Sequence, residues 1–320
     1  MINRTNYLQV RHYLHHTEHV RQNDPETVLR NRAHLRHLLE WADATPFPRA
    51  KTLEPFPAYL RDANLAPATL KKTLTVARQF FTFCRMEYPH LYKPVTETWI
   101  ESLQPPRMLR TESRLPQRKY YTLEDVLKIA LLPVDTLHLE RARVAVCMLF
   151  LSGMRADALA SLPIHCVDLA NRAISQLPEF GVRTKNHKAA ITYLLPIPEL
   201  LSVVERWHQR VCLLPSDSLW YATLDKLCGE SLTATTIAFN GRNDVIRRDI
   251  VKLCETYKLP YLSPHKLRHG HVVYALKKAT TMSQLKGISQ NVMHSSVVIT
   301  DQVYGRLVGE DVKHVIEGLG

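Results

Sequence analysis

The chain has 320 residues, and its 42 Lys and Arg outnumber its 30 Asp and Glu, which gives a formal net charge of +12 and a pI of about 9.5. This length predicts two domains, and a hydrophobic content of 45% excludes disorder over most of the chain. The ten glycines are too scattered for a dinucleotide fingerprint or a phosphate-binding loop.

The first part of the chain is predicted to be an all-helical domain covering residues 1–105. Residues 25–44 repeat apolar side chains at helical spacing, and Asp24 is placed to cap this helix before Pro25. Residues 68–88 form a second helix with an apolar face and a basic face. The basic face is explained equally well by solvation and by contact with DNA.

Residues 106–119 are predicted to form a basic, proline-containing linker. Glu112 is the one acid here, opposing Arg107, Arg110, Arg114, Arg118 and Lys119. Residues 1–115 carry 17 basic and 11 acidic side chains, and residues 116–320 carry 25 and 19, so each part has a net charge of +6. Two basic domains joined by a basic linker could close around duplex DNA and neutralise its phosphates from both sides.

Residues 120–320 are predicted to form a mainly α domain with a small β element. Thr122 is a candidate cap for a helix at its start, and Gly153 ends a strongly apolar helix. Short β-prone runs in residues 171–196 flank a polar turn and predict a small sheet or hairpin. Further helices are predicted at residues 137–153, 199–214, 244–257 and 269–278.

The cysteines and the N-terminus predict an intracellular protein. Six cysteines lie in apolar stretches without a CxxC pair, as is typical of reduced, buried thiols. The N-terminal segment has no apolar signal-peptide region, and no run of about 18 apolar residues occurs. We therefore expect a cytoplasmic protein with no membrane partner.

The reactive side chains gather towards the C-terminus. His265 and Arg268 are one helical turn apart and could face one phosphate together, and His294 and Tyr304 follow them. The same H-x-x-R spacing occurs at His138 and Arg141, so the pair alone is weak evidence.

The ordered set of these residues resembles the tyrosine recombinases, also called the phage integrase family, over nearly the whole chain. Arg155 lies in a turn similar to the family's Thr-Gly-Leu-Arg motif, and residues 184–188 (TKNHK) resemble its lysine hairpin. His265, Leu267, Arg268 and His269 match its His-x-Leu-Arg-His box. Residues 292–294 correspond to its Leu-Gly-His box, and Tyr304 to its nucleophile. The resemblance makes Lys185 the predicted catalytic lysine and Lys188 the alternative.

The chemistry of phosphodiester attack explains why this set is useful. Negative charge builds on the nonbridging oxygens, where Arg155 and Arg268 can donate charge-assisted hydrogen bonds without a metal. Tyr304 is a weak nucleophile at neutral pH, and His265 is the candidate base that takes its proton. The lysine could protonate the leaving 5′ oxygen, and His294 would hydrogen-bond the phosphate. The resemblance implies a 3′-phosphotyrosyl intermediate that is resealed without ATP.

Two positions depart from the family pattern. The acidic residue that often stands three positions after the first arginine is replaced by Ala158, with Asp157 beside it. The glycine before the last histidine is replaced by Met293. Neither change removes a reactive group.

The resemblance implies a site-specific recombinase, the integrase of a mobile genetic element for example, acting as a homo-tetramer on double-stranded DNA, with possible accessory DNA-bending proteins. The alternatives are a type IB topoisomerase-like or telomere-resolving enzyme, and a DNA-binding protein with a disabled site. We expect no cofactor and no metal. The histidines near the N-terminus include zinc-compatible spacings but lack a convincing further ligand, which favours polar helix faces near DNA.

Overall fold

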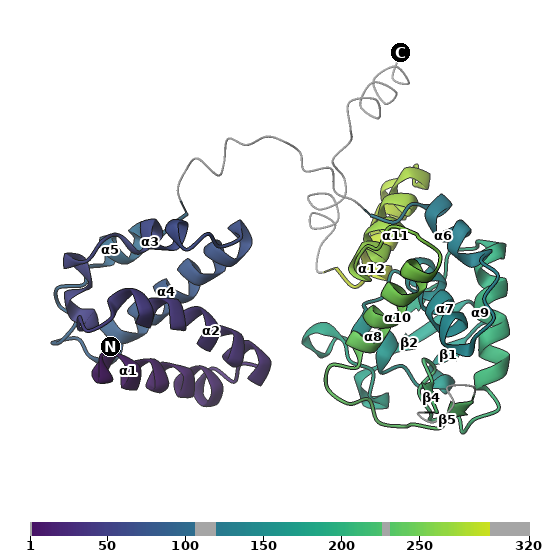
Figure 1. The fold of residues 1–320 in the computed structure, drawn as a ribbon, viewed down its shortest axis with the longest axis horizontal. Coiled ribbons are helices and arrows are strands. Elements are labelled where there is room, and N and C mark those ends of the chain that lie inside the picture. Colours follow the sequence, from purple (N-terminus) through teal and green to yellow (C-terminus); the bar gives the residue numbers. More distant parts are fainter. Residues whose placement is uncertain (1, 106–119, 226–230, 295–320) are drawn as a thin grey trace, which may run out of the picture. The chain divides into compact units, whose positions relative to one another are not determined.

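The computed structural model describes residues 2–105, 120–225 and 231–294 and divides the chain into two compact units, Met1–Pro116 and Gln117–Gly320. The predicted linker at residues 106–119 lies outside the described residues, as does Tyr304. Each unit is described by itself (Figure 1).

The first unit is helical throughout its described residues. Its helices, in chain order, are α1 (Arg4–His15), α2 (Pro25–Ala42), α3 (Phe56–Asp62), α4 (Pro67–Glu87) and α5 (Glu97–Ser102). The Asp24 side chain accepts a hydrogen bond from the Glu26 N–H and caps α2, as the sequence predicts.

Helix α4 forms the centre of this unit because its apolar face is wide and aromatic. Phe80 and Phe81 are fully buried, and Phe47 packs edge-on against both, with ring centroids 5.2 and 5.7 Å away. Leu70, Leu74, Ala77 and Cys84 belong to the predicted apolar face of this helix and are buried as well.

The second unit is mainly helical and contains two small antiparallel sheets. Its helices are α6 (Leu123–Ala130), α7 (Leu137–Ser152), α8 (Ala156–Ala160), α9 (Pro198–Val211), α10 (Asn243–Thr256), α11 (His265–Lys278) and α12 (Met282–Asn291). One sheet has the order β1-β2-β3, with strands Val167–Asp168, Ala173–Gln176 and Ala190–Tyr193. The other pairs β4 (Thr223–Leu224) with β5 (Leu232–Thr233).

Helix α7 is the core of the second unit. Every residue from Val144 to Ser152 is buried, and the helix is packed by α6, α9, α10 and α11 (Figure 1). A helix that is apolar on all sides is stable only when other elements surround it. Helix α6 begins with the predicted cap: Thr122 and Asp125 exchange hydrogen bonds in a capping box.

The predicted fold class is confirmed: the chain is mainly α with a small antiparallel sheet. Some details differ from expectation. Helix α11 begins at His265 rather than residue 269, and no bounds were predicted for α1, α3, α5, α8 and α12. Cys212 is exposed because it directly follows the end of α9, whereas Cys84, Cys147, Cys166 and Cys254 are buried as predicted. Among the described residues, no helix is long and apolar enough to span a membrane.

Candidate active site

The first candidate residue, Arg155, follows the C-terminus of α7. The helix ends at Gly153, whose φ of +62° lies in the left-handed region that favours glycine. A Cβ here would meet the His271 ring at 2.6 Å and Cγ1 of Val292 at 2.9 Å. The turn thus packs directly against α11 and the end of α12. Two residues later, half-buried Arg155 is the N-cap residue directly before α8.

Arg268 ties together the segments that carry two other candidates. Its side chain is only 2% exposed, and one guanidinium nitrogen donates a 2.7 Å hydrogen bond to the Gly153 carbonyl oxygen. The other terminal nitrogen donates to the carbonyl of Val292. These carbonyls stand two residues before Arg155 and two before His294. Buried arginine thereby fixes the spacing of both segments through charge-assisted hydrogen bonds.

The C-terminus of α12 determines where His294 lies. The His294 N–H donates to the Ser289 carbonyl at 3.0 Å, and the Met293 N–H donates to the Gln290 carbonyl at 2.8 Å. This pair of bonds is a Schellman motif, which requires a left-handed residue at Met293, where φ is +56°. A glycine would adopt this conformation without strain. This explains why the Leu-Gly-His box that residues 292–294 resemble has a glycine at the position of Met293.

The two candidate histidines lie in a cationic environment. His265 is the first residue of α11, and its pKa is lowered by partial burial and by the charges of Arg268, Arg155 and Lys266. Burial lowers the pKa of His294 to about 4, with further contributions from Arg268, Arg155, His265 and Lys188. Both rings are therefore neutral at pH 7. Arg155, His265, Arg268 and Lys188 all lie within electrostatic range of His294.

The candidate lysines lie on the turn between β2 and β3. Lys185 begins a short 3₁₀ turn, and Asn186 and His187 have positive φ values of 60° and 51°. The Thr184 hydroxyl closes the turn by donating to the Lys188 carbonyl at 2.6 Å. Both lysine side chains are exposed. Lys188 is the one whose charge contributes to the lowered pKa of His294.

His271 and Gly270 have structural roles here that the sequence did not indicate. Nδ1 of His271 is 2.7 Å from the carbonyl oxygen of Phe150, and the ring is 1% exposed. Burial lowers its pKa to about 4, so neutral His271 donates to that carbonyl. A Cβ on Gly270 would lie 1.9 Å from the Tyr121 carbonyl oxygen, so only glycine lets α11 approach that segment. The one sequence feature that could have indicated these roles is the position of Gly270 and His271 directly after the residues that match the His-x-Leu-Arg-His box.

The region after Arg155 has a carboxylate beside the buried Ala158. Asp157 forms an ion pair with Arg183 at 3.7 Å, and Arg183 also donates to the carbonyls of Ala238 and Phe239. Arg183 therefore connects the segment before the lysine turn both to α8, through Asp157, and to the loop before α10. In residues 2–105, 120–225 and 231–294, no three His, Cys, Asp or Glu residues are grouped as metal ligands.

The second H-x-x-R pair belongs to a buried network elsewhere in this unit. Arg141 donates to Asp249 at 2.6 Å and to the Ala222 carbonyl at 2.9 Å. Tyr221 donates to the same carboxylate, and Nε2 of His138 lies 3.3 Å from its other oxygen. The network joins α7 to α10 and lies at the opposite end of α7 from Arg155, so its role is structural.

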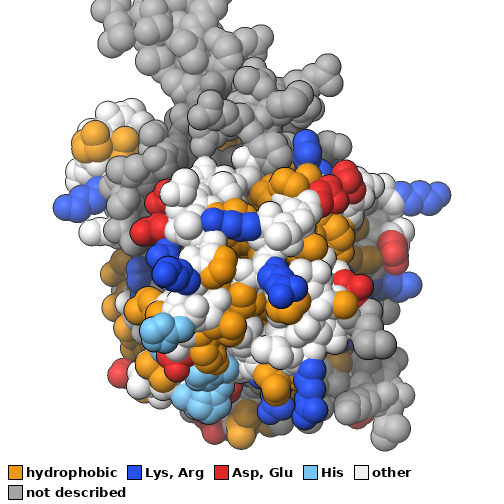
Figure 2. All heavy atoms as spheres, turned by 90° about the vertical axis from the view of Figure 1, so that its left-hand side faces the viewer, with side chains coloured by type: hydrophobic (Ala, Val, Ile, Leu, Met, Phe, Trp, Pro, Cys, Tyr) orange, Lys and Arg blue, Asp and Glu red, His pale blue; other side chains and the backbone are white. Residues whose placement is uncertain are grey.

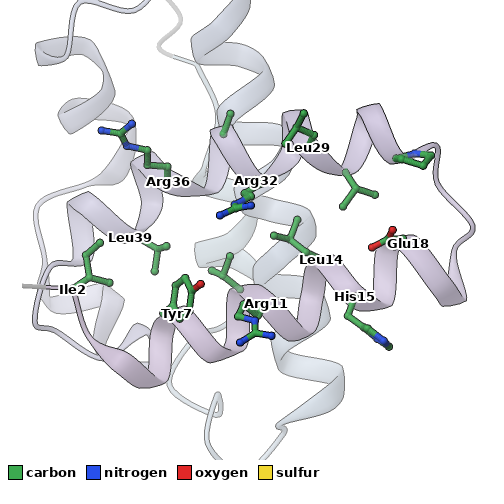
Figure 3. Close-up of a pocket in the computed structure, with 14 residues that line it drawn as sticks. Ile2, Tyr7, Arg11, Leu14, His15, Glu18, Leu29, Arg32, Arg36 and Leu39 are labelled. Carbon is green, nitrogen blue, oxygen red and sulfur yellow. The ribbon is translucent and has the colours of Figure 1, made fainter. Parts of the chain in front are cut away.

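The first unit has a groove of about 790 Å³ between α1 and α2. Leu14, Leu29 and Leu39 contribute apolar surface, and Arg11 and Arg32 are among its charged lining residues (Figure 3). On the face drawn in Figure 2, Lys and Arg side chains are spread among hydrophobic ones, and histidines gather near the lower edge. Asp and Glu side chains occur on the same face.

The comparisons with known proteins identify the fold. No protein-family model and no curated protein matches the chain in sequence. A solved structure of the Tn1549 transposon integrase in complex with transposon right end DNA is 14% identical, covers 100% of this chain and 99% of its own, and has a TM-score of 0.63. A lambda integrase dimer bound to a COC′ core site is 13% identical, covers 92% and 96%, and has a TM-score of 0.62. The chain therefore has the tyrosine recombinase fold.

Proposed function

We propose that this protein is a site-specific tyrosine recombinase that cuts and rejoins DNA through Tyr304, without metal or ATP. The observation that carries the proposal is the role of Arg268, which joins the segments of Arg155 and His294 through the carbonyls of Gly153 and Val292. This convergence brings together residues from three helix ends that are distant in sequence. The resemblance of the motifs and the likeness to integrases bound to DNA support it.

The proposed reaction is an in-line displacement at phosphorus. The Tyr304 oxygen forms a bond to phosphorus while the bond to the 5′ oxygen breaks, leaving a 3′-phosphotyrosyl linkage and a 5′ hydroxyl. His265, neutral at pH 7 because burial and neighbouring arginines lower its pKa, accepts the tyrosine proton. Lys185 or Lys188 donates a proton to the 5′ oxygen, and attack by a 5′ hydroxyl reverses the steps.

Arg155 and Arg268 stabilise the charge that builds on the nonbridging oxygens. A guanidinium group has five N–H donors in a planar array, so Arg268 can hold the two backbone carbonyls and still donate to a phosphate. His294, with its pKa lowered to about 4, is a neutral hydrogen-bond donor rather than a further cation. The site thus combines two permanent charges with two neutral imidazoles and a lysine.

DNA is the proposed partner, bound as a duplex with specific recombination sites by a homo-tetramer, with accessory DNA-bending proteins possible. The net charge of +12 and its even division between the two parts of the chain support backbone contacts from both. The two proteins compared above were solved on transposon-end and core-site DNA. Salt will therefore weaken DNA binding steeply.

A nicked suicide substrate tests the proposal. Duplexes made from the DNA that flanks the coding sequence carry a nick just downstream of the cleavage point, so that the freed short strand diffuses away and traps the adduct. Wild-type protein is expected to give a covalent protein–DNA band that survives SDS, and Tyr304→Phe to give none. Arg268→Lys is expected to bind the same DNA and yield at least about 100-fold less adduct.

Three other outcomes separate the alternatives. Binding without an adduct from wild-type protein would indicate a DNA-binding protein with a disabled site. Relaxation of supercoiled plasmid without site preference would indicate a topoisomerase-like enzyme. Conversion of a palindromic junction to closed hairpin ends would indicate a telomere-resolving enzyme.

A further inference from the structure

Asn291, the last residue of α12, is hydrogen-bonded to the edge strand β3. Its side-chain oxygen accepts from the Tyr193 N–H at 2.7 Å, and its side-chain nitrogen donates to the Tyr193 carbonyl at 3.0 Å. The Thr192 hydroxyl donates to the Asn291 carbonyl at 3.0 Å. Buried Gln176 in turn donates to that hydroxyl at 2.6 Å, which extends the connection to β2.

These bonds connect two segments of the candidate site. Strand β3 follows the lysine turn, and Tyr193 lies five residues after Lys188. Five residues of extended chain span about 17 Å, which is the greatest separation of the two residues along the strand. Asn291 lies three residues before His294, within the turn that the Schellman motif fixes. Beyond β3, the Leu195 N–H donates to the Leu151 carbonyl at 2.9 Å, so the same strand is also held to the end of α7.

The asparagine amide suits this contact for a chemical reason. It presents one acceptor and one donor side by side, and these match the N–H and C=O of one strand residue. An aspartate would face the Tyr193 carbonyl with a second acceptor, and a leucine would offer neither group. Asn291 thus pairs with the open side of β3 as a neighbouring strand would.

We propose that Asn291 is a positioning residue, which sets the reach of the lysine hairpin towards the phosphate beside His294. The inference rests on the proposed function, because it assigns to Asn291 the delivery of the general acid. With the two side-chain bonds to Tyr193 broken, the hairpin keeps its own β2–β3 pairing and the bond from Thr192 to the Asn291 main-chain carbonyl, but its distance to the segment of His294 is held less tightly. The lysine then reaches the leaving oxygen in a smaller fraction of complexes.

Asn291→Leu tests this inference when it is measured on two suicide substrates. One has the ordinary 5′ oxygen at the cleavage point, and the other has sulfur there, a leaving group that needs no proton because thiols are far more acidic than alcohols. We expect the variant to cleave the ordinary substrate about 10- to 100-fold more slowly, and the sulfur substrate within about threefold of wild type. Either Lys185→Ala or Lys188→Ala removes the general acid. That variant should likewise cleave the ordinary substrate slowly and the sulfur substrate at nearly the wild-type rate.

Gln290→Leu is the matched control, because Gln290 is an exposed side chain on the same helix and is next to Asn291. It should cleave both substrates like wild type. Asn291→Ala serves as a second variant if the leucine lowers the melting temperature, since it removes the amide without adding an apolar side chain. Equal loss on both substrates, or no loss on either, would overturn the role of Asn291. If wild-type protein cleaves neither substrate, the proposed function itself fails.

Discussion

His271 should make the second unit acid-labile through its own titration. Burial lowers the pKa of His271 to about 4, whereas a histidine in an unfolded chain has a pKa near 6.5. As the pH falls below about 6.5, the unfolded chain takes up a proton that the folded chain does not. The stability that neutral His271 contributes is therefore complete above about pH 6.5 and is lost between there and about pH 4.

The size of this effect follows from the shift of about 2.5 pKa units, which corresponds to about 3 kcal/mol over the whole range and to about 2 kcal/mol between pH 8 and pH 5. His271→Phe should lower the unfolding free energy by about 1–3 kcal/mol at pH 8, because the Phe150 carbonyl loses its buried donor. At pH 5 the difference from wild type should shrink by about 2 kcal/mol, because the variant cannot take up this proton on unfolding.

Urea unfolding at pH 8 and pH 5, followed on the transition of the second unit, measures both values. His165→Phe is the control: His165 also approaches a backbone carbonyl, that of Ser216 at 3.0 Å, but at an exposed position. Its pH dependence should match that of wild type. Stability curves that run parallel for wild type and His271→Phe would refute the reasoning, because they would mean that the buried ring takes up no proton on unfolding.

Two further substitutions test the packing of the second unit, one beside the candidate site and one at the other end of α7. Gly270→Ala places a Cβ 1.9 Å from the Tyr121 carbonyl oxygen, so α11 must shift by about 1 Å; adduct formation should fall by about 100-fold, whereas Gly287→Ala, with open space around it, should leave it unchanged. Arg141→Met strands the buried carboxylate of Asp249 and should cost about 3–5 kcal/mol by urea unfolding. The exposed pair Arg247–Asp244 is the comparison, and Arg247→Met should cost less than about 1 kcal/mol; similar costs for the two variants would contradict the assigned role of the network.

Local signals predicted much of the fold. Apolar periodicity located α4, and a continuous apolar run located α7. Thr122 marked the start of α6 and Gly153 the end of α7, because capping depends on neighbours within four residues. Helix α1 was expected only as a polar helix face without bounds, because its mean hydropathy is low and it carries several polar and basic side chains. Helix α11 was predicted to start one turn late because its first turn was interpreted as a reactive motif rather than as helix.

The candidate site was predicted as a set of residue types, but its supports were not. Arg141 and Asp249 are 108 positions apart, and His271 and Phe150 are 121 apart, so no local pattern could pair them. Asn291 and Tyr193 are likewise 98 residues apart. Arg268 was predicted to contact a phosphate, and the structure adds that it also holds the carbonyls of Gly153 and Val292. Tyr304 lies outside the described residues, so its role stays a prediction.

The most direct test of the proposed function is to identify the bond between protein and DNA. The trapped adduct is digested with protease and nuclease, and the nucleotide-bearing peptide is sequenced by mass spectrometry. The proposal predicts a single modified residue, Tyr304, joined to a 3′ phosphate, with a free 5′ hydroxyl on the released strand. Attachment through another residue, or through a 5′ phosphate, would contradict it.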